Sequence, residues 1–418
     1  MTSPVHYKNR VAYLEGSALQ DLAKKFGTPL FAYSENFIRQ RCQQLRKAFS
    51  GHPTLACYAL KANSNLSLLK IIFQEGLGAD VVSQGELKKA LLSKVVPEQI
   101  VFSGVGKKPE EILEGIRSGI FSFQVESLGE LELLQKLSAQ QKKEVRICLR
   151  INPNINVKTN PYIATGLYKT KFGIPESQIG EALALLGKKS SVHLVGLSCH
   201  LGSQIRDTVP YLKASNRLVE IADGLRDEGF SIEVLDMGGG FGVSYKGEKV
   251  PALSAYAEAI QKPLRKKPYR LIIEPGRWIV AESGILISQV LYTKSNPHKN
   301  FLVLDASMTE LIRPALYEAH HEIQGCKKTS RGKKIYDVVG PVCETSDFLG
   351  LERGMPEVES GELLWISHSG AYGSSMASHY NVRPQAAEVL VSGKKVTLIR
   401  KRESLEEVWR DELHPQSR

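Results

Sequence analysis

The sequence predicts an α/β fold, a TIM (β/α)8 barrel followed by a mainly β C-terminal domain that also takes in the N-terminal strands. The chain has 418 residues, too many for one small core, which indicates two domains or one barrel with an addition. Eight short apolar runs recur with helical patterns between most of them. After Arg277 the segments become short and β-rich, with Gly, Asn and Pro between them.

The N-terminal part contains two short strand-like segments, around Tyr7–Leu14 and Leu30–Tyr33. Apolar residues with helical spacing then predict a helix from Glu35 to Phe49, which ends at Gly51. We expect the two strand-like segments to join the β region at the other end of the chain.

The barrel strands are predicted at eight apolar runs. These are Leu55–Leu60, Ala79–Val82, Ile100–Ser103, Phe121–Val125, Val145–Ile151, Val192–His200, Ile232–Asp236 and Leu271–Glu274. Capping-box patterns at Ser83–Glu86 and Ser127–Glu130 predict two helix starts, and the longest helix stops near Gly229. This alternation favours a barrel over an open doubly wound sheet. The run Gly238–Gly242 also departs from the dinucleotide fingerprint GxGxxG, because Val243 follows it.

Five β-rich segments without long helices between them follow the barrel. They are Ile285–Tyr292, Phe301–Asp305, Ile335–Val339, Leu363–Ile366 and Glu388–Ile399. The predicted domains are therefore a barrel at 35–277 and a β domain made of 1–34 and 278–418.

Composition narrows the class of protein. The formal charge is +11, but basic residues are spread along the chain without aromatic-interleaved motifs, so we expect no nucleic-acid partner. No apolar run approaches the ~20 residues that span a bilayer, so no membrane association is expected. The six cysteines form no CxxC pair and the N-terminus lacks an apolar signal region, which favours a cytoplasmic protein with reduced thiols. His320-His321-Glu322 matches no zinc spacing, and no metal is predicted.

Polar or glycine residues lie at the carboxyl ends of most of the predicted barrel strands, where TIM-barrel active sites form. They are Lys61, Asp80, Ser103, Arg150, His200, Gly238–Gly240 and Glu274–Arg277. A partly desolvated lysine at a strand end has a lowered pKa and can attack carbonyls. Its alternative is a lysine whose stem packs on the core while its amine reaches water.

The other strand ends allow similar pairs of interpretations. Successive glycines let backbone N–H groups approach a phosphate, or they only form a flexible turn. Glu274 can keep a heterocyclic nitrogen protonated, or it can pair with Arg277. His200 can stack on a flat ring or move protons, or it can be a satisfied core histidine.

Motifs spread over nearly the whole chain resemble the fold-type III pyridoxal-phosphate decarboxylases. They are Tyr58-Ala59-Leu60-Lys61-Ala62-Asn63, His200-Leu201-Gly202-Ser203-Gln204, Gly238-Gly239-Gly240, Glu274-Pro275-Gly276-Arg277, Arg313-Pro314-Ala315-Leu316-Tyr317, Cys343-Glu344 and Ala371-Tyr372-Gly373. The resemblance implies an eight-stranded α/β barrel, a β domain and an active homodimer. It is strongest for members that act on diaminopimelate.

The resemblance also implies roles for single residues. Lys61 corresponds to the lysine that forms a Schiff base with pyridoxal 5'-phosphate, and His200 to the histidine stacked on the cofactor ring. Glu274 corresponds to the partner of the pyridine nitrogen. The further cofactor contacts are Asp80, Ser203, Gly240, Gly276, Arg277 and Tyr372.

For the substrate, the resemblance implies a distal carboxylate site made of Arg277, Arg313 and Tyr317, with Tyr372 also in contact. Glu344 corresponds to the acid that meets the distal ammonium, and Cys343 to a proton donor. In the family these last two positions reach across from the other subunit. Lys61, His200 and Cys343 are the expected catalytic residues, and the expected reaction converts meso-2,6-diaminopimelate to L-lysine and CO2.

Two alternatives stay open at this point. The same scaffold serves decarboxylases of ornithine, arginine, lysine or carboxynorspermidine, but Arg313 with Tyr317 suits a carboxylate better than a basic tail. A non-catalytic pyridoxal-phosphate-binding protein would not need the proton donor Cys343. One departure from the family pattern is His379, where asparagine is expected.

Overall fold

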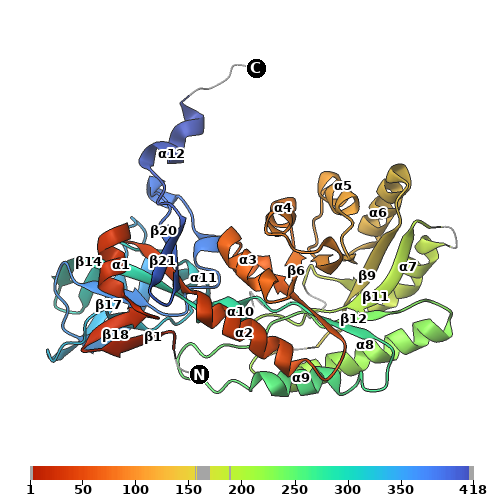
Figure 1. Cartoon of the computed structure of the whole chain (residues 1–418), viewed down its shortest axis with the longest axis horizontal. Helices are drawn as coiled ribbons and strands as arrows, with labels where there is room; N and C mark the ends of the chain where they lie inside the picture. The colour runs from red at the N-terminus through yellow and green to blue at the C-terminus, as the bar shows by residue number, and fades with distance from the viewer. Residues whose placement is uncertain (1–2, 156, 158–169, 188–189, 414–418) are drawn as a thin grey trace. The chain divides into compact units, whose positions relative to one another are not determined.

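Eight parallel strands close into a barrel in the computed structural model, which describes residues 3–155, 157, 170–187 and 190–413 (Figure 1). The strands are β5 (Thr54–Ala59), β6 (Gly78–Val81), β7 (Ile100–Phe102), β8 (Ser122–Val125), β9 (Val145–Asn152), β11 (Val192–Ser198), β12 (Val234–Asp236) and β13 (Arg270–Ile273). β13 pairs with β5 and so closes the ring, with Ile272 opposite Leu55. The two-residue strand β10 (Ile174–Pro175) pairs with β9. The predicted fold class is confirmed.

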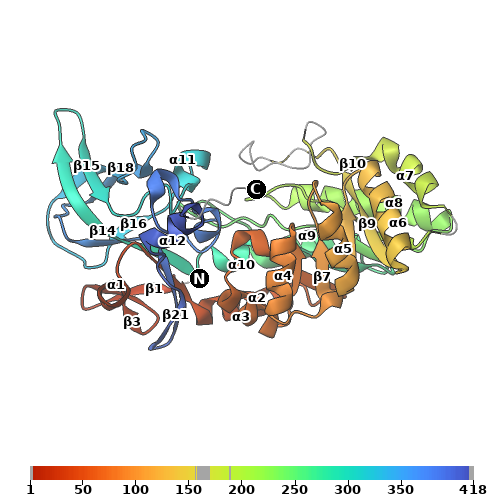
Figure 2. The ribbon, with the colours of Figure 1, turned by 90° about the horizontal axis from the view of Figure 1, so that it is seen from above.

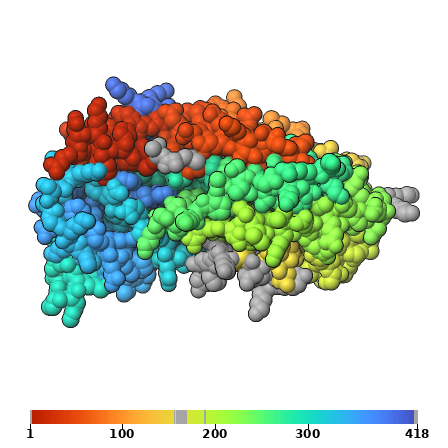
Figure 3. Space-filling model, turned by 90° about the horizontal axis from the view of Figure 1, so that it is seen from below, coloured from red at the N-terminus to blue at the C-terminus, as the bar shows by residue number. Residues whose placement is uncertain are grey.

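The barrel helices lie outside the strands (Figure 2). They are α3 (Leu66–Gln74), α4 (Gln84–Leu92), α5 (Pro109–Ser118), α6 (Leu128–Gln141), α7 (Ile179–Leu186), α8 (Val209–Asp227) and α9 (Leu253–Gln261). Side chains of α8 and α9, in green, lie side by side on the face seen in Figure 3. Ser215 ties these two helices together by donating to the carbonyl of Ile260 at 2.7 Å.

The two predicted capping boxes form only in part. The Ser83 hydroxyl accepts from the N–H of Glu86 at 3.2 Å, as expected for an N-cap. The Glu86 carboxylate, however, accepts from the N–H of Val82, one residue before the cap. Glu130 repeats this arrangement by accepting from the N–H of Glu126. Each glutamate therefore satisfies a donor of the strand-to-helix turn, because the cap residue is extended and its neighbour's N–H points back to the helix.

The barrel interior changes from apolar to polar along its strands. Val234 and Ile272 belong to one buried cluster. Residues two apart on a strand face the same side, so Asp236 and Glu274 face that cluster's side at the carboxyl ends of β12 and β13. The side chain of Gln124, on β8, reaches Asp236 at 2.8 Å, which confirms that both point inward.

The second unit is mainly β. Its long sheet has the order β18-β17-β15-β14-β4-β20-β21, and β16 and β19 extend it from β14. The strands are β4 (Leu30–Ser34), β14 (Gly284–Ser295), β15 (Asn300–Leu304), β16 (Ile323–Gly325), β17 (Lys333–Val339), β18 (Phe348–Pro356), β19 (Leu363–Ile366), β20 (Ala387–Ser392) and β21 (Lys395–Arg400). The segment predicted at 388–399 is two antiparallel strands, because Gly393 adopts a left-handed φ of 59° at the turn between them.

The N-terminal strand β4 joins this sheet, as predicted, and it lies between β14 and β20. Before it come β1 (Val5–Lys8), β2 (Val11–Leu14), β3 (Ser17–Ala18) and α1 (Leu19–Phe26). The segment predicted at Tyr7–Leu14 is two strands, β1 and β2, which belong to a separate three-stranded sheet. The core of the unit combines residues from both ends of the chain, among them Leu14, Leu30, Ile287 and Val389.

The chain divides into units at Arg39–Ser244 with Lys249–Trp278, and at Met1–Ile38 with Tyr245–Glu248 and Ile279–Arg418. The helices α2 (Glu35–Ala48) and α10 (Arg277–Val280) cross these boundaries. The remaining helices α11 (Arg313–Tyr317) and α12 (Leu405–Trp409) belong to the β unit. None of the helices in the described ranges has both the length and the apolar character needed to cross a bilayer.

Candidate active site

Lys61 lies directly after β5 in a single 3-10 turn, Leu60–Ala62. Leu60 and Ala62 are fully buried, while the lysine side chain is 38% exposed. Its Nζ lies 3.4 Å from Oδ2 of Asp80, at the end of β6. The strand end therefore presents an amine that is partly shielded from water and held next to a buried carboxylate.

Asp80 is held at this position by the strand itself. Its Oδ1 is buried and has no hydrogen-bond partner among the described residues. An unsatisfied buried acceptor costs roughly 1–3 kcal/mol, so its retention beside a lysine indicates a role in a ligand site.

Two buried carboxyl groups, Asp236 and Glu274, influence each other's protonation inside the barrel. Asp236 accepts from the Gln124 amide and from the N–H of Gly238, each at 2.8 Å. Burial raises the pKa of Glu274 well above its usual range, and the nearby Asp236 and Asp80 charges raise it further. Glu274 thus holds the proton and donates to Asp236. Asp236 was not among the predicted site residues, although its position at the end of a predicted strand, shortly before the Gly238–Gly240 run, was a usable signal.

His200 follows β11 and is neutral. Its Nδ1 accepts from the N–H of Gly239 at 3.2 Å, which leaves the ring proton on Nε2. Burial lowers the pKa of His200 well below 6.5, and the charges of Lys61 and Arg150 act in the same direction. The ring lies 4.0 Å from Glu274, so it belongs to the same group of side chains.

The glycine run is required by close backbone approach and not only by turn flexibility. A Cβ on Gly239 would lie 2.1 Å from the carbonyl oxygen of Glu274. A Cβ on Gly240, whose φ is 89°, would lie 2.2 Å from that of Gly202. Any larger residue at either position would displace the loops that surround the strand ends.

Arg277 completes the barrel side of the site. Its Nη2 donates to the Ser203 hydroxyl at 3.1 Å, and the guanidinium is buried. Gly276, just before it, packs against Lys61's turn, since a Cβ there would lie 3.0 Å from the Cβ of Ala62. By contrast, Arg150 at the end of β9 forms an ion pair with Glu126 at 2.8 Å, which is a structural role.

The groups at the barrel end fit a phosphorylated pyridine aldehyde. Lys61 supplies an amine, Glu274 a buried proton and His200 a flat neutral ring. Arg277 with Ser203 and the glycine backbone form a set that suits a phosphate. The buried Oδ1 of Asp80, which has no hydrogen-bond partner among the described residues, can accept a hydrogen bond from a ligand.

In the β unit, Arg313 and Tyr317 lie one turn apart on α11, and so on one face of it. Arg313 is only 5% exposed. Its Nη1 donates to Nε2 of His321 at 2.9 Å, and its guanidinium carbon lies 4.6 Å from the centre of the Tyr245 ring. His321 and Tyr245 were not among the predicted site residues.

Cys343 and Glu344 lie in an exposed turn after β17. The N–H of Cys343 donates to the Asn381 side chain at 2.9 Å, and the Tyr380 hydroxyl donates to Glu344 at 3.3 Å. Tyr372 is half-buried and has a φ of 56°, a left-handed conformation that costs energy in a bulky residue. His379, the departure from the family pattern, pairs with Glu403 at 2.6 Å.

Comparison with known proteins decides the family. Residues 35–281 match the model of the pyridoxal-dependent decarboxylase family, pyridoxal binding domain. A diaminopimelate decarboxylase of Aquifex aeolicus is 44% identical, over 96% of this chain and 95% of that protein. The chain belongs to the diaminopimelate decarboxylase family. The predicted family is therefore confirmed.

Solved structures agree with this assignment. Diaminopimelate decarboxylase from Helicobacter pylori, complexed with L-lysine, is 43% identical with a TM-score of 0.91, covering 94% of this chain and 99% of that one. The enzyme from M. jannaschii, in co-complex with L-lysine, is 37% identical with a TM-score of 0.93, covering 98% of both chains. These similarities extend through the β unit, beyond the pyridoxal binding domain.

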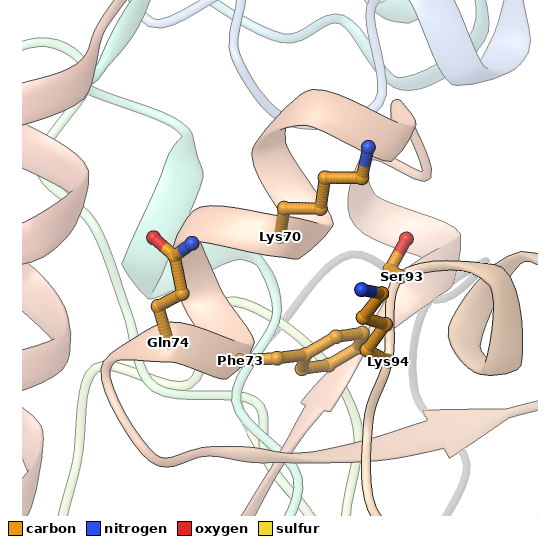
Figure 4. A pocket seen from close by; sticks show the side chains of 5 residues that line it. All are labelled: Lys70, Phe73, Gln74, Ser93 and Lys94. Atoms are coloured by element: carbon orange, nitrogen blue, oxygen red, sulfur yellow. The ribbon is translucent and has the colours of Figure 1, made fainter.

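A separate cavity of about 360 Å³ lies on the outside of the barrel, lined by Lys70, Phe73, Gln74, Ser93 and Lys94 (Figure 4). It is formed where α3 and α4 end. Helices that follow parallel strands run back along them, so this cavity is at the opposite end of the barrel from Lys61. A cation beside a helix C-terminus complements the helix dipole, which accounts for Lys94 without a ligand. The cavity in Figure 4 therefore lies outside the candidate active site.

Proposed function

We propose that the chain decarboxylates meso-2,6-diaminopimelate to L-lysine and CO2, with pyridoxal 5'-phosphate bound at the barrel end. The observation that carries this proposal is the set of Lys61, Asp80 and the buried Glu274 at neighbouring strand ends of a barrel. The alternative pair Glu274–Arg277 is less favoured, because burial raises the pKa of Glu274 well above its usual range, and an uncharged carboxyl does not form an ion pair.

The cofactor, when bound, supplies a protonated pyridine ring that accepts the electron pair left behind by departing CO2. The residues prepare this chemistry. Lys61 offers the amine that attaches the cofactor. Glu274 holds a proton for the ring nitrogen, and Asp236 keeps that proton on Glu274 by its like charge. His200 offers a flat neutral face, and Arg277 with Ser203 binds the phosphate.

Decarboxylation breaks the bond between the α-carbon and its carboxylate, and the electron pair stays on the carbon side. A proton must then reach that carbon. We assign the proton to the thiol of Cys343, which is exposed and so accessible to a reacting group. Glu344, adjacent in sequence, is proposed to bind the distal ammonium of the substrate.

The distal carboxylate is assigned to Arg313, with Arg277, Tyr317 and Tyr372 as further contacts. A guanidinium can hold both oxygens of a carboxylate through two parallel N–H donors. This preference favours diaminopimelate over ornithine or arginine, whose distal ends carry no carboxylate.

We further propose a homodimer in which Cys343 and Glu344 serve the partner's cofactor. Both are exposed in the single chain, as residues that reach outward should be. We also propose that the enzyme is cytoplasmic, since all six cysteines are free thiols.

The test is CO2 release from meso-diaminopimelate, L-lysine, L-ornithine and L-arginine in parallel, with added cofactor. We expect diaminopimelate to exceed the others in kcat/KM by at least about a hundredfold, since several charged contacts are lost without the distal carboxylate. The Arg313→Ala variant should lose most of this preference, while Arg353→Ala, an arginine of β18, serves as its control. Faster release from a basic amino acid would favour the alternative on the same scaffold, and no release from any substrate would favour a binding protein.

A further inference from the structure

Two neutral groups of the β unit contact the Arg313 guanidinium and help to fix it. One is the imidazole of His321, which accepts from Nη1 at 2.9 Å. The other is the ring of Tyr245, whose centre lies 4.6 Å from the guanidinium carbon. The hydrogen bond holds one nitrogen of the guanidinium, and the ring contact holds its central carbon, so together the two contacts restrict the movement of the group.

The hydrogen-bond pattern leaves His321 a single tautomer. Its Nδ1 lies 2.7 Å from the backbone oxygen of Ser367, which can only accept, so Nδ1 carries the proton. Nε2 is then an acceptor, as the donor Arg313 requires. His321 is fully buried, and burial lowers its pKa well below 6.5, with the Arg313 charge acting in the same direction. The imidazole is therefore neutral at the pH of the cell.

Hydrogen bonds next to the strands β16 and β19 hold Ser367, whose carbonyl orients His321. Ser367 follows β19 and Glu322 precedes β16, and these two strands are paired. The N–H of Ser367 donates to the carbonyl of Glu322 at 2.9 Å, and the N–H of Glu322 donates to the Ser367 hydroxyl at 3.1 Å. The carbonyl that orients His321 is thus part of a rigid element.

Tyr245 is fixed in a similar way. Its ring meets His321 edge-on, with centres 5.5 Å apart, and tilts against His368 at 5.1 Å. The N–H of Tyr245 donates to the Glu248 carboxylate at 2.8 Å, which closes the short segment that carries the ring. The ring under Arg313 is therefore packed on several sides.

We infer that His321 and Tyr245 are positioning residues that hold Arg313 in one orientation for the distal carboxylate of the substrate. The inference rests on the proposed function. A neutral acceptor suits this purpose, because it orients the guanidinium without cancelling its charge. A glutamate in place of His321 would compete with the substrate's carboxylate for the same donors. Selection for a distal carboxylate then depends on residues that do not touch the substrate.

The experiment compares two ligands of the cofactor-loaded enzyme, L-lysine, which has a carboxylate, and cadaverine, which is the same diamine without it. Their dissociation constants are measured by calorimetry for wild type, His321→Asn and His321→Gln. The asparagine amide can still donate to Ser367 but does not reach Arg313, whereas the glutamine oxygen lies near the position of Nε2. We expect His321→Asn to weaken L-lysine about tenfold more than cadaverine, the loss expected for one charged hydrogen bond. His321→Gln should restore most of the difference.

A general disturbance of the fold would weaken the binding of both ligands alike. If the ratio of the cadaverine to the L-lysine dissociation constant is the same in His321→Asn as in wild type, the inference is therefore overturned. Should that variant fail to fold, Tyr245→Leu is decisive, because it removes the ring face while Tyr245→Phe keeps it. The ratio of the cadaverine to the L-lysine dissociation constant should be lower in Tyr245→Leu than in wild type, and it should be unchanged in Tyr245→Phe. Equal ratios in these two variants would also overturn the inference. His320→Asn, at the neighbouring half-buried histidine that contacts Arg353, is the matched control. The proposed function fails separately, if wild type releases no CO2 from diaminopimelate.

Discussion

The barrel end and the Arg313 cluster show two different ways of building a polar site. At the barrel end, Asp80 lies on β6, while Lys61 and Glu274 come directly after β5 and β13, so the ends of the strands place all three side chains. In the β unit, Arg313 takes its orientation from Tyr245 and His321, and His321 takes its own from Ser367. The first arrangement is local in sequence and the second is not. Groups that serve the general chemistry are therefore recognisable along the chain, while groups that choose the substrate depend on distant contacts.

The largest effect should come from Lys61→Ala. Without the attaching amine, kcat should fall by at least roughly a thousandfold, as for other covalent catalysts. After borohydride reduction, mass spectrometry should find the cofactor on the Lys61 peptide of wild type and nowhere in the variant. Lys70→Ala, at an exposed lysine of α3, is the control and should keep full activity. Cofactor still covalently attached in Lys61→Ala would disprove the assignment.

Next in size is the effect of the carboxyl pair. Glu274→Gln keeps the shape of the side chain but cannot pass a proton to the ring, so kcat should fall roughly a hundredfold. Asp236→Asn should act more weakly and in another way. It removes the like charge that holds the proton on Glu274, so the pKa of Glu274 falls and the alkaline limb of the kcat profile moves to lower pH. A pH profile that stays in place would show that the two carboxyls are not coupled.

The assignment of Cys343 can be sharpened by mixing subunits. Lys61→Ala and Cys343→Ala enzymes are each expected to be inactive. If Cys343 acts in the partner's site, equal mixing gives half mixed dimers with one intact site each, so about a quarter of wild-type activity should return. The measurement is CO2 release after verified subunit exchange. Activity that stays at zero would place Cys343 and Lys61 of one chain in the same site.

The smallest expected effect is on the pH dependence of the free energy of unfolding, which shows whether His321 is neutral or charged in the folded protein. His321 stays neutral when folded but takes up a proton below about pH 6.5 when unfolded. The unfolded state then binds more protons, so stability falls as pH falls from about 7 to 5.5. His321→Gln lacks this contribution and should lose about 1 kcal/mol less over that range. Chemical unfolding of both proteins at the two pH values measures the difference; equal losses would mean that His321 is protonated in the fold.

The strand-end positions of Lys61, Asp80 and Glu274 could be predicted from the sequence for a physical reason. An apolar strand followed by a polar residue is a short-range pattern, and the closed barrel brings all such strand ends to one edge. Asp236 was not predicted, because its place before the glycine run does not by itself show which way the side chain points. Only the hydrogen bond from Gln124, 112 positions earlier, shows that Asp236 points into the barrel. His321 was not predicted either, because it was considered only as part of His320-His321-Glu322, which matches no zinc spacing.

By itself, the sequence determined the fold class, the family and the strand-end positions of Lys61, His200 and Glu274, because strand periodicity and motif spacing are properties of neighbouring residues. The tertiary structure alone decided which protonation states Glu274 and His321 adopt. The proton on Glu274 depends on burial beside Asp236 and Asp80, and the neutral ring of His321 depends on burial between Arg313 and Ser367. Desolvation and charge coupling act through space, so only the folded chain decides them.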